Sequence, residues 1–181
     1  MRAKTSIQEL CQIGVYTAVI VACAQLPPIP LPGGVPITLQ SWAIALGGLL
    51  LGPKNGALAA LAYVLLGAVG APVFAGLTGG MSVILRHTGG FILSFPLVAL
   101  LAGLGARKGK AGWVFAGLIA GTLVNWLVGM VYFSWVLSTT LFYAFSMAVL
   151  PFIPTAVLRI ILLPVISKGI KTALTRARVT I

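Results

Sequence analysis

Apolar segments long enough to cross a lipid bilayer follow one another along the chain, separated by short breaks rich in Pro, Gly and basic residues. A spanning helix needs roughly 17–25 predominantly apolar residues, and each segment approaches that length. The pattern predicts an all-α membrane protein, six transmembrane helices in one domain of residues 1–181. The stretch 135–150 fits either an interfacial helix or part of the fifth span. The predicted helices are 7–26, 37–51, 56–70, 89–105, 113–134 and 153–174.

Composition supports the membrane as the solvent of this chain. Hydrophobic residues make up 60% of it and charged residues 7%, whereas a soluble domain carries about 25% charged residues. The formal net charge is +11, but the basic residues form no amphipathic or aromatic-interleaved surface, so we expect no nucleic-acid partner. We expect a multi-pass protein of the inner (cytoplasmic) membrane, with the lipid bilayer around it.

Basic residues near the ends of the predicted helices indicate orientation, because cytoplasmic loops are enriched in Lys and Arg. In a six-helix arrangement most of them fall on one side, which places the N- and C-termini in the cytoplasm. The loops on the opposite side, 27–36 and 69–88, are long and rich in Pro and Gly. The basic residues on the cytoplasmic side are Arg2, Lys4, Lys54, Arg107, Lys108, Lys110, Lys168, Lys171, Arg176 and Arg178.

Two arginines depart from that distribution. Arg86 lies in or just below the second outer loop, and Arg159 lies about one turn inside the last predicted helix. A cation inside a membrane helix costs at least a few kcal/mol. Either one alone could extend to the interface or cap loop carbonyls. Two on the same outer face favour a shared anionic ligand, and the start of the last helix would add partial positive charge suited to a carboxylate.

The residue types limit the chemistry that the chain can perform. It contains no GxxxxGK[ST] motif, so it does not bind ATP through a P-loop. Glu9 is the only acid, which argues against a carboxylate proton relay and against a catalytic triad. His87 is interpreted as a loop hydrogen-bonding residue rather than a general base. The cysteines show no metal-ligand spacing, and we expect neither enzyme activity nor a metal or cofactor.

A stripe of small residues runs along the first predicted helix, where Gly14, Ala18 and Ala22 recur at every fourth position. Such stripes let two membrane helices approach closely. The stripe either packs against another helix of the same chain or is the docking site for a separate membrane subunit.

Three motifs carry a resemblance to a known family. "VPITLQ" (35–40), "GAVGAPVFAGLTGGMSVILRHTGGFILSF" (67–95) and "VLPFIPTAVLRI" (149–160) resemble the BioY family in the same order. BioY proteins are the biotin-specific S-components of energy-coupling factor (ECF) transporters. The resemblance implies an ECF S-component-like fold of six helices, with a biotin pocket near the outer face. It also implies a transmembrane coupling subunit and two ATPase subunits as partners, with the coupling subunit docked on the family's AxxxA stripe, here Ala18 to Ala22.

Two positions depart from the family pattern. The family usually has PxDLLK near the start of the sixth helix, where this chain has "PTAVLR" (154–159). Arg159 keeps the charge of the Lys, but Ala156 replaces the Asp that helps hold the polar head of the ligand. The preceding loop usually reads GPTGG or RPTGG, and here His87 replaces the Pro.

The functional groups of biotin suit the polar residues that remain. Arg86 and Arg159 could bind the carboxylate through two hydrogen bonds each, and whether one of them instead contacts the ureido oxygen stays open. Gln40 offers an amide that complements the ureido group, or an interhelical hydrogen bond instead.

The missing Asp contact calls for another polar group, and His87, Asn125 and Thr155 are the candidates. Asn125 lies in the middle of the fifth predicted helix, where a helix–helix hydrogen bond is the alternative. Phe74 and Trp42 could wall the apolar ring of the ligand or simply pack.

The stretch "LRHTGGF" (85–91) is interpreted as the outer lip of the pocket. Arg86, His87 and Thr88 would meet an anionic vitamin there, while Gly89 lets the backbone close over it and begins the fourth helix. Two other readings remain: an S-component for another small anionic vitamin, and a non-transport membrane scaffold. The sequence also leaves open whether the chain works alone, as a homo-oligomer or with ATPase partners.

Overall fold

The computed structural model describes residues 7–29 and 35–177, and this part of the chain forms helices and connecting loops without a strand. The expected all-α architecture is therefore confirmed for the described residues. Arg2, Lys4 and Arg178, and residues 30–34 of the predicted outer loop, lie outside them. The elements are α1 (Ile7–Ala24), α2 (Gln40–Ala68), α3 (Met81–Ile84), α4 (Gly89–Leu93), α5 (Phe95–Arg107), α6 (Ala111–Leu137), α7 (Leu141–Ala148), the 3-10 helix η1 (Leu150–Phe152) and α8 (Ile153–Arg176).

Four helical stretches of the described chain are long and apolar enough to cross a membrane. α5 is apolar but shorter. Large apolar side chains such as Leu127, Trp135 and Val165 are exposed on the outside of the helices, where lipid would cover them. The protein is therefore a multi-pass membrane protein. The four stretches are Ile7–Ala24, Gln40–Ala68, Ala111–Leu137 and Leu141–Arg176.

α2 contains both the second and the third predicted helix, joined at a sharp break. Gly52 has φ 80° and ψ −179° in the middle of the element, a conformation that glycine adopts far more readily than other residues. Pro53 follows and lacks a backbone N–H, which prevents a regular helix here. The chain turns back so closely that Gly56 lies against the backbone of Gly47 and Gly48. α2 therefore consists of two arms, before and after Gly52.

The predicted helix 89–105 is divided into α4 and α5 at Ser94. Pro96 stands in the first turn of α5 and has no N–H to donate to a carbonyl four residues earlier. The Ser94 hydroxyl instead donates to the Phe91 carbonyl oxygen at 2.9 Å. The predicted helix start at Gly89 is confirmed.

The ambiguous stretch 135–150 continues the fifth span only in its first residues, and a separate short helix follows. α6 extends to Leu137 and ends at Ser138, whose backbone is left-handed with φ 51°. Thr140 then caps α7 by accepting a hydrogen bond from the Tyr143 backbone N–H. α7 and η1 lead directly into α8.

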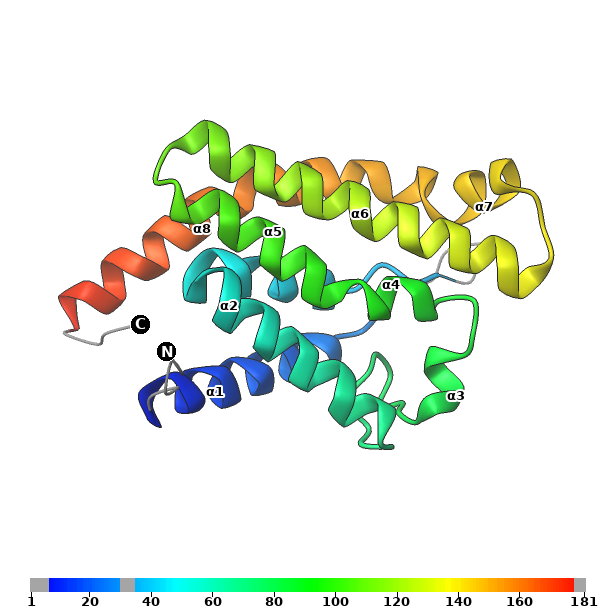
Figure 1. The fold of residues 1–181 in the computed structure, drawn as a ribbon, viewed down its shortest axis with the longest axis horizontal. Coiled ribbons are helices and arrows are strands. Elements are labelled where there is room, and N and C mark those ends of the chain that lie inside the picture. Colours follow the sequence, from blue (N-terminus) through cyan, green and yellow to red (C-terminus); the bar gives the residue numbers. More distant parts are fainter. Residues whose placement is uncertain (1–6, 30–34, 178–181) are drawn as a thin grey trace, which may run out of the picture.

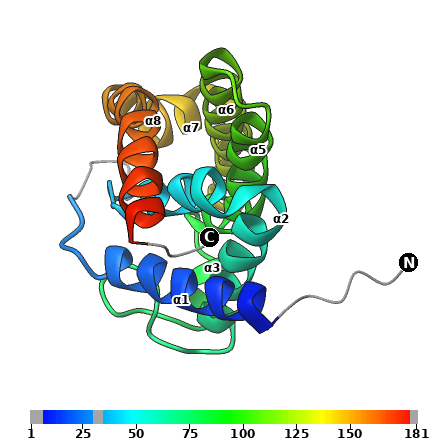
Figure 2. The same cartoon turned by 90° about the vertical axis from the view of Figure 1, so that its left-hand side faces the viewer.

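The helices approach closely through small residues. Gly48 of α2 lies against the Ala99 carbonyl of α5, and Gly105 of α5 lies against Gly117 of α6. α2 occupies the middle of the molecule, with α1 on one side and α6 and α8 on the other (Figures 1 and 2). Close backbone contacts of this kind add van der Waals packing between apolar helices.

α1 is attached to both arms of α2 by hydrogen bonds. The Tyr16 hydroxyl donates to the Ala43 carbonyl oxygen at 2.9 Å. The single hydroxyl proton of Thr17 is shared between the Ile13 carbonyl oxygen of its own helix at 2.8 Å and the Ala59 carbonyl oxygen of α2 at 3.2 Å. Gly14, Ala18 and Ala22 lie on the other side of α1 and are exposed. Within the described residues, the alternative that this stripe packs against a helix of the same chain is therefore wrong.

The start of α1, the α5–α6 connection and the end of α8 lie at the same end of the molecule (Figure 1). Lys54, next to the break in α2, reaches Glu9 at the start of α1 with 3.9 Å between Nζ and Oε2. This exposed ion pair contributes little to stability. It does place the only acid of the chain among the basic residues of that end.

Replacing Gly48 with Leu is expected to destabilise the protein by about 1–3 kcal/mol, because a side chain there would meet the α5 backbone, which cannot move aside cheaply. Thermal unfolding in detergent measures the effect. Gly169→Ala in α8 is the control, since nothing lies within 4 Å of a Cβ at that position. An unchanged unfolding midpoint for Gly48→Leu would contradict the packing described above.

Candidate functional site

A cavity of about 300 Å³ opens where α2, α4 and α8 begin. Its walls come from the stretch before α2, the loop before α3, the α3–α4 turn, α6 and the start of α8. The lining residues are Val35, Pro36, Ile37, Thr38, Gln40, Ser41, Trp42, Phe74, Ala75, Thr78, Val83, Arg86, His87, Thr88, Phe91, Ile92, Phe95, Asn125, Trp126, Phe152, Thr155, Ala156 and Arg159.

The structure brings most of the predicted ligand-binding residues to this one cavity. Gly89 is the exception: it lies behind the lining, where a side chain would collide with the Ile84 carbonyl. Its N–H donates to the Arg86 carbonyl oxygen at 2.8 Å, so its contribution is to close the α3–α4 turn. The predicted residues in the lining are Gln40, Phe74, Arg86, His87, Thr88, Asn125 and Arg159.

Arg159 is buried, with 5% of its surface exposed. Its Nη2 donates to the Thr122 hydroxyl at 2.7 Å and its Nη1 to the Ser41 carbonyl oxygen at 3.3 Å. The Arg159 side chain therefore does not extend to the interface, which excludes that alternative for this residue. Its Nε finds no hydrogen-bond partner in the described part of the chain.

The charge of Arg159 has no counter-ion within the described residues. Glu9, the only acid of the sequence, contacts Lys54 instead. Neutral oxygens are the partners of the guanidinium, and a buried charge without an ionic partner is costly, by several kcal/mol. An anionic or strongly accepting group in the cavity would offset that cost.

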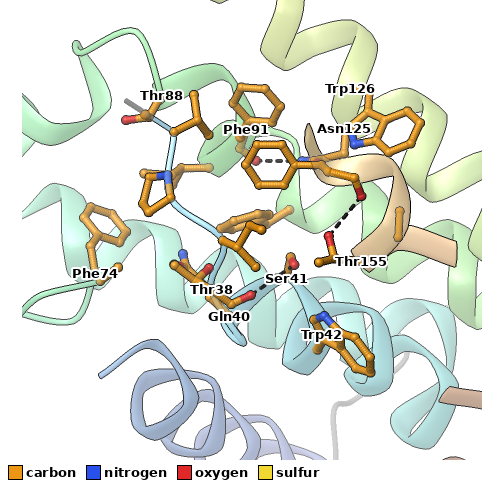
Figure 3. A pocket seen from close by; sticks show the side chains of 18 of the residues that line it. Thr38, Gln40, Ser41, Trp42, Phe74, Thr88, Phe91, Asn125, Trp126 and Thr155 are labelled. Atoms are coloured by element: carbon orange, nitrogen blue, oxygen red, sulfur yellow. Dashed lines mark hydrogen bonds between the residues drawn. The ribbon is translucent and has the colours of Figure 1, made fainter. Parts of the chain in front are cut away.

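Gln40 supplies a second unsatisfied donor to the same cavity. The side chain is 4% exposed, and its Nε2 has no hydrogen-bond partner among the described residues. Figure 3 shows it at the start of α2 beside Thr38 and Ser41. Buried polar groups almost always have partners, so donors without partners on two residues that line one cavity favour an acceptor bound there.

Asn125 makes the helix–helix hydrogen bonds that were its alternative role. Its Nδ2 donates to the Phe91 carbonyl oxygen at 3.0 Å (Figure 3). It also donates to the Ser94 hydroxyl at 2.7 Å. The residues at the interruption between α4 and α5 are thus hydrogen-bonded to a side chain of α6. Asn125 also lines the cavity, so structural and ligand-facing roles coexist in one side chain.

Aromatic rings form the apolar wall. Trp42 and Phe74 were candidates from the sequence, whereas Trp126, Phe91 and Phe152 were not. The rings of Phe91 and Phe152 stack with their centroids 6.5 Å apart. Trp126 directly follows the predicted site residue Asn125, and this adjacency is the only sequence signal that would have identified it.

Thr122 and Ser41 were also missed by the sequence analysis. Thr122 precedes Asn125 by three residues, which places the two on one helix face, and this spacing would have identified it. Ser41 contributes only its backbone oxygen to Arg159, a contact that carries no sequence signal.

The mouth of the cavity, at residues 85–91, differs from its buried end. Arg86 is exposed at the mouth, so extension to the interface remains an alternative for it. The His87 ring packs edge-on against Phe133 with centroids 5.3 Å apart. The Tyr132 hydroxyl donates to the Ile84 carbonyl oxygen at 3.1 Å and fixes α3 beside the lip. No cluster of His, Cys, Asp or Glu in the described residues could hold a metal ion.

Comparisons with known proteins find one family. A model described as the BioY family matches residues 1–176. A probable biotin transporter BioY of Pyrococcus horikoshii is 45% identical over 67% of this chain and 71% of its own length. Biotin transporter BioY2 of Lactococcus lactis subsp. cremoris is 31% identical over 94% of this chain and 93% of its own.

A solved structure agrees over nearly the whole chain. The crystal structure of the S-component for biotin from an ECF-type ABC transporter matches with a TM-score of 0.80 and 30% identity. The match covers 95% of each chain, so the helical arrangement described above is that of a known membrane fold.

Replacing Arg159 with Met is expected to stabilise the ligand-free protein, because it removes a buried charge that has no counter-ion. The gain should be on the order of 1–4 kcal/mol, the range found when buried ionic groups give way to apolar side chains. The unfolding midpoint in detergent without ligand measures it. Arg176→Met on exposed α8 surface is the matched control. A lower midpoint for Arg159→Met would show that the charge serves the fold rather than a ligand.

Proposed function

The chain belongs to the BioY family, and from that premise we propose that it binds biotin in this cavity as the S-component of an ECF-type uptake transporter. The observation that carries the proposal is that two residues lining a preformed cavity, Arg159 and Gln40, each hold a buried donor without a partner among the described residues, Arg159 Nε and Gln40 Nε2. A cavity of this size that combines aromatic walls with polar side chains is typical of a small-molecule site. Transport, not catalysis, is the activity.

The arrangement of donors and acceptors fits the groups of biotin. The carboxylate and the ureido oxygen both accept hydrogen bonds, and Arg159 with Gln40 receives one of them. Arg86 at the mouth suits the opposite end of an elongated ligand. The fused ring and the aliphatic chain of biotin lie against Trp42, Phe74 and their neighbours.

The ureido N–H groups need acceptors, and Ala156 supplies none where the family usually has Asp. Thr155 and Asn125 are the replacements that we propose. The Thr155 hydroxyl donates to the Phe152 carbonyl oxygen at 2.9 Å, which leaves its lone pairs to accept. The Asn125 amide uses its Nδ2 within the protein, and its Oδ1 is the acceptor assigned to the ligand.

Six membrane crossings are proposed, with both termini in the cytoplasm of the cell and the cavity toward the outer face. α1, the two arms of α2, α4 with α5, α6 and α8 are the crossings. The first arm of α2 is short, so the stretch before it lies at membrane depth. Irregular backbone is tolerated there when it lines a cavity, and residues 35–38 do line this cavity. The basic residues at the opposite end support the orientation in the inner membrane.

The exposed stripe of Gly14, Ala18 and Ala22 is proposed as the docking site for the transmembrane coupling subunit. Two ATPase subunits complete the transporter and supply the ATP chemistry for which this sequence has no P-loop. The support is the exposure of all three small residues on one face of α1, since such faces allow close helix contact.

Arg159→Met is expected to weaken biotin binding by about 2–5 kcal/mol, or roughly thirty- to several-thousandfold, because a buried charged hydrogen-bond partner is lost. Arg86→Met should weaken it less, since Arg86 is exposed. Equilibrium binding of labelled biotin to the purified protein is the measurement. Lys168→Met, an exposed cation of α8, is the control.

Competition with other small anionic vitamins belongs to the same experiment. Displacement of labelled biotin by a different vitamin at lower concentration than unlabelled biotin would reassign the substrate. A folded wild-type protein that binds no biotin would refute the proposal.

Ala18→Trp is expected to abolish ATP-driven biotin uptake while leaving biotin affinity unchanged, because a bulky ring would keep the coupling subunit away from α1. Uptake in cells that express the whole transporter, and binding by the isolated protein, give the two readings. Ala116→Trp on the exposed face of α6 is the control for bulk. Normal uptake with Ala18→Trp would rule out this docking face.

A further inference from the structure

Gln25, the residue directly after α1, contacts one loop that lies far from it in the sequence through both ends of its side-chain amide. Its Nε2 donates to the carbonyl oxygens of Val73 at 3.1 Å and Phe74 at 3.3 Å, with a longer contact to Pro72 at 3.5 Å. Its Oε1 accepts from the Leu77 backbone N–H at 3.0 Å. One amide side chain therefore satisfies carbonyl and N–H groups of a loop with no regular secondary structure.

That loop is part of the cavity wall. Phe74, Ala75 and Thr78 line the cavity, and the Phe74 N–H closes the loop by donating to the Thr78 carbonyl oxygen at 2.9 Å. Leu77 has φ 56°, a left-handed conformation that is unfavourable for a residue with a branched side chain. The hydrogen bond from Leu77 N–H to Gln25 stabilises this conformation.

The second arm of α2 holds the same loop from the other side. The Tyr63 hydroxyl donates to the Val73 carbonyl oxygen at 3.0 Å, and the Phe74 ring packs edge-on against Tyr63 and directly over Gly67. The base of the loop is closed by the Gly80 N–H, which donates to the Gly67 carbonyl oxygen at 2.7 Å. α2 thus fixes the base of the loop and the Phe74 ring, whereas Gln25 bonds to the Leu77 side of the loop.

Gln25 is itself fixed to the last turn of α1. Its backbone N–H donates to the carbonyl oxygens of Val21 and Ala22 at 3.2 and 3.3 Å. Four residues later, Ile29 exchanges two hydrogen bonds with Ile37, each 2.9 Å long, and Ile37 also lines the cavity. Two separate parts of the cavity wall are therefore attached at the outer end of α1.

We propose that Gln25 is a positioning residue for ligand binding: it ties the Leu77 side of the 72–78 loop to the end of α1, so that the position of this part of the cavity wall depends on the position of α1. Gln25 does not line the cavity, and it acts through the loop. The inference rests on the proposed function, since biotin is the ligand that the loop would retain. It adds a physical link between the face of α1 that carries Gly14, Ala18 and Ala22 and the binding cavity.

Two substitutions test the donor and the acceptor of the Gln25 amide separately. Gln25→Glu keeps the length and can still accept from Leu77, but it cannot donate and places negative charge against carbonyl oxygens. Gln25→Lys keeps donation to those carbonyls and loses the acceptor. We expect Gln25→Glu to release biotin about tenfold faster, equivalent to roughly 1.4 kcal/mol, with association little changed. Gln25→Lys should remain within about threefold of wild type, because most of the hydrogen bonds are donated by Gln25.

Hydrogen–deuterium exchange of residues 70–80 in the ligand-free protein is the second measurement. Gln25→Glu should raise exchange in this segment and leave the interior of α2 protected. Gln12→Glu, the same change about 20 Å away along α1 at 1.5 Å per residue, is the matched control and should alter neither reading. If Gln25→Glu does not fold, Gln25→Asn takes its place, since it keeps the amide but is too short to reach the loop.

The proposal is overturned if Gln25→Glu leaves biotin release and loop exchange at wild-type values. It is equally overturned if Gln25→Lys changes both as much as Gln25→Glu, because a purely steric role would have that result. Failure of the proposed function looks different: the wild-type protein would not bind biotin, while the exchange experiment would still test the link between Gln25 and the loop.

Discussion

One buried guanidinium in a chain with a single acid is the constraint on which the site depends. Arg159 comes from α8 and donates to Thr122 of α6 and to the Ser41 carbonyl of α2. Three helices therefore meet at a charge that no carboxylate of the described residues neutralises. Burial of such a charge is unfavourable. The site therefore favours binding of a hydrogen-bond acceptor, and the packing of the helices elsewhere has to offset the cost of keeping Arg159 buried.

Close backbone contacts provide that packing. The break at Gly52 lets α2 run twice through the middle of the molecule, so that α5 can lie against both arms through Gly48 and Gly103. Because lipid competes equally well for apolar side chains, small residues rather than large ones determine which helices touch. The interruption at Ser94 has a partner in Asn125, so the irregular backbone near the cavity is satisfied from within the protein.

The sequence predicted the helices better than their breaks. Apolar length and basic loops are local signals, so the start at Gly89 and the limits of α6 and α8 were found nearly as they are. The division at Ser94 was missed, although Pro96 is a residue type that commonly marks the first turn of a new helix. Arg159 was recognised because a cation is rare in an apolar helix, whereas the roles of Ser41 and Gln25 depend on contacts between distant segments that no local pattern contains.

The positions of the four tryptophans determine what the intrinsic fluorescence of the protein reports. Trp42 and Trp126 line the cavity, whereas Trp113 and Trp135 are half or more exposed on the outside of the helices. Indole emission responds to the polarity and quenching groups around the ring. The protein therefore carries its own optical reporter: occupation of the cavity changes the surroundings of one pair of fluorophores while the lipid-facing pair supplies a constant background, and no label has to be attached.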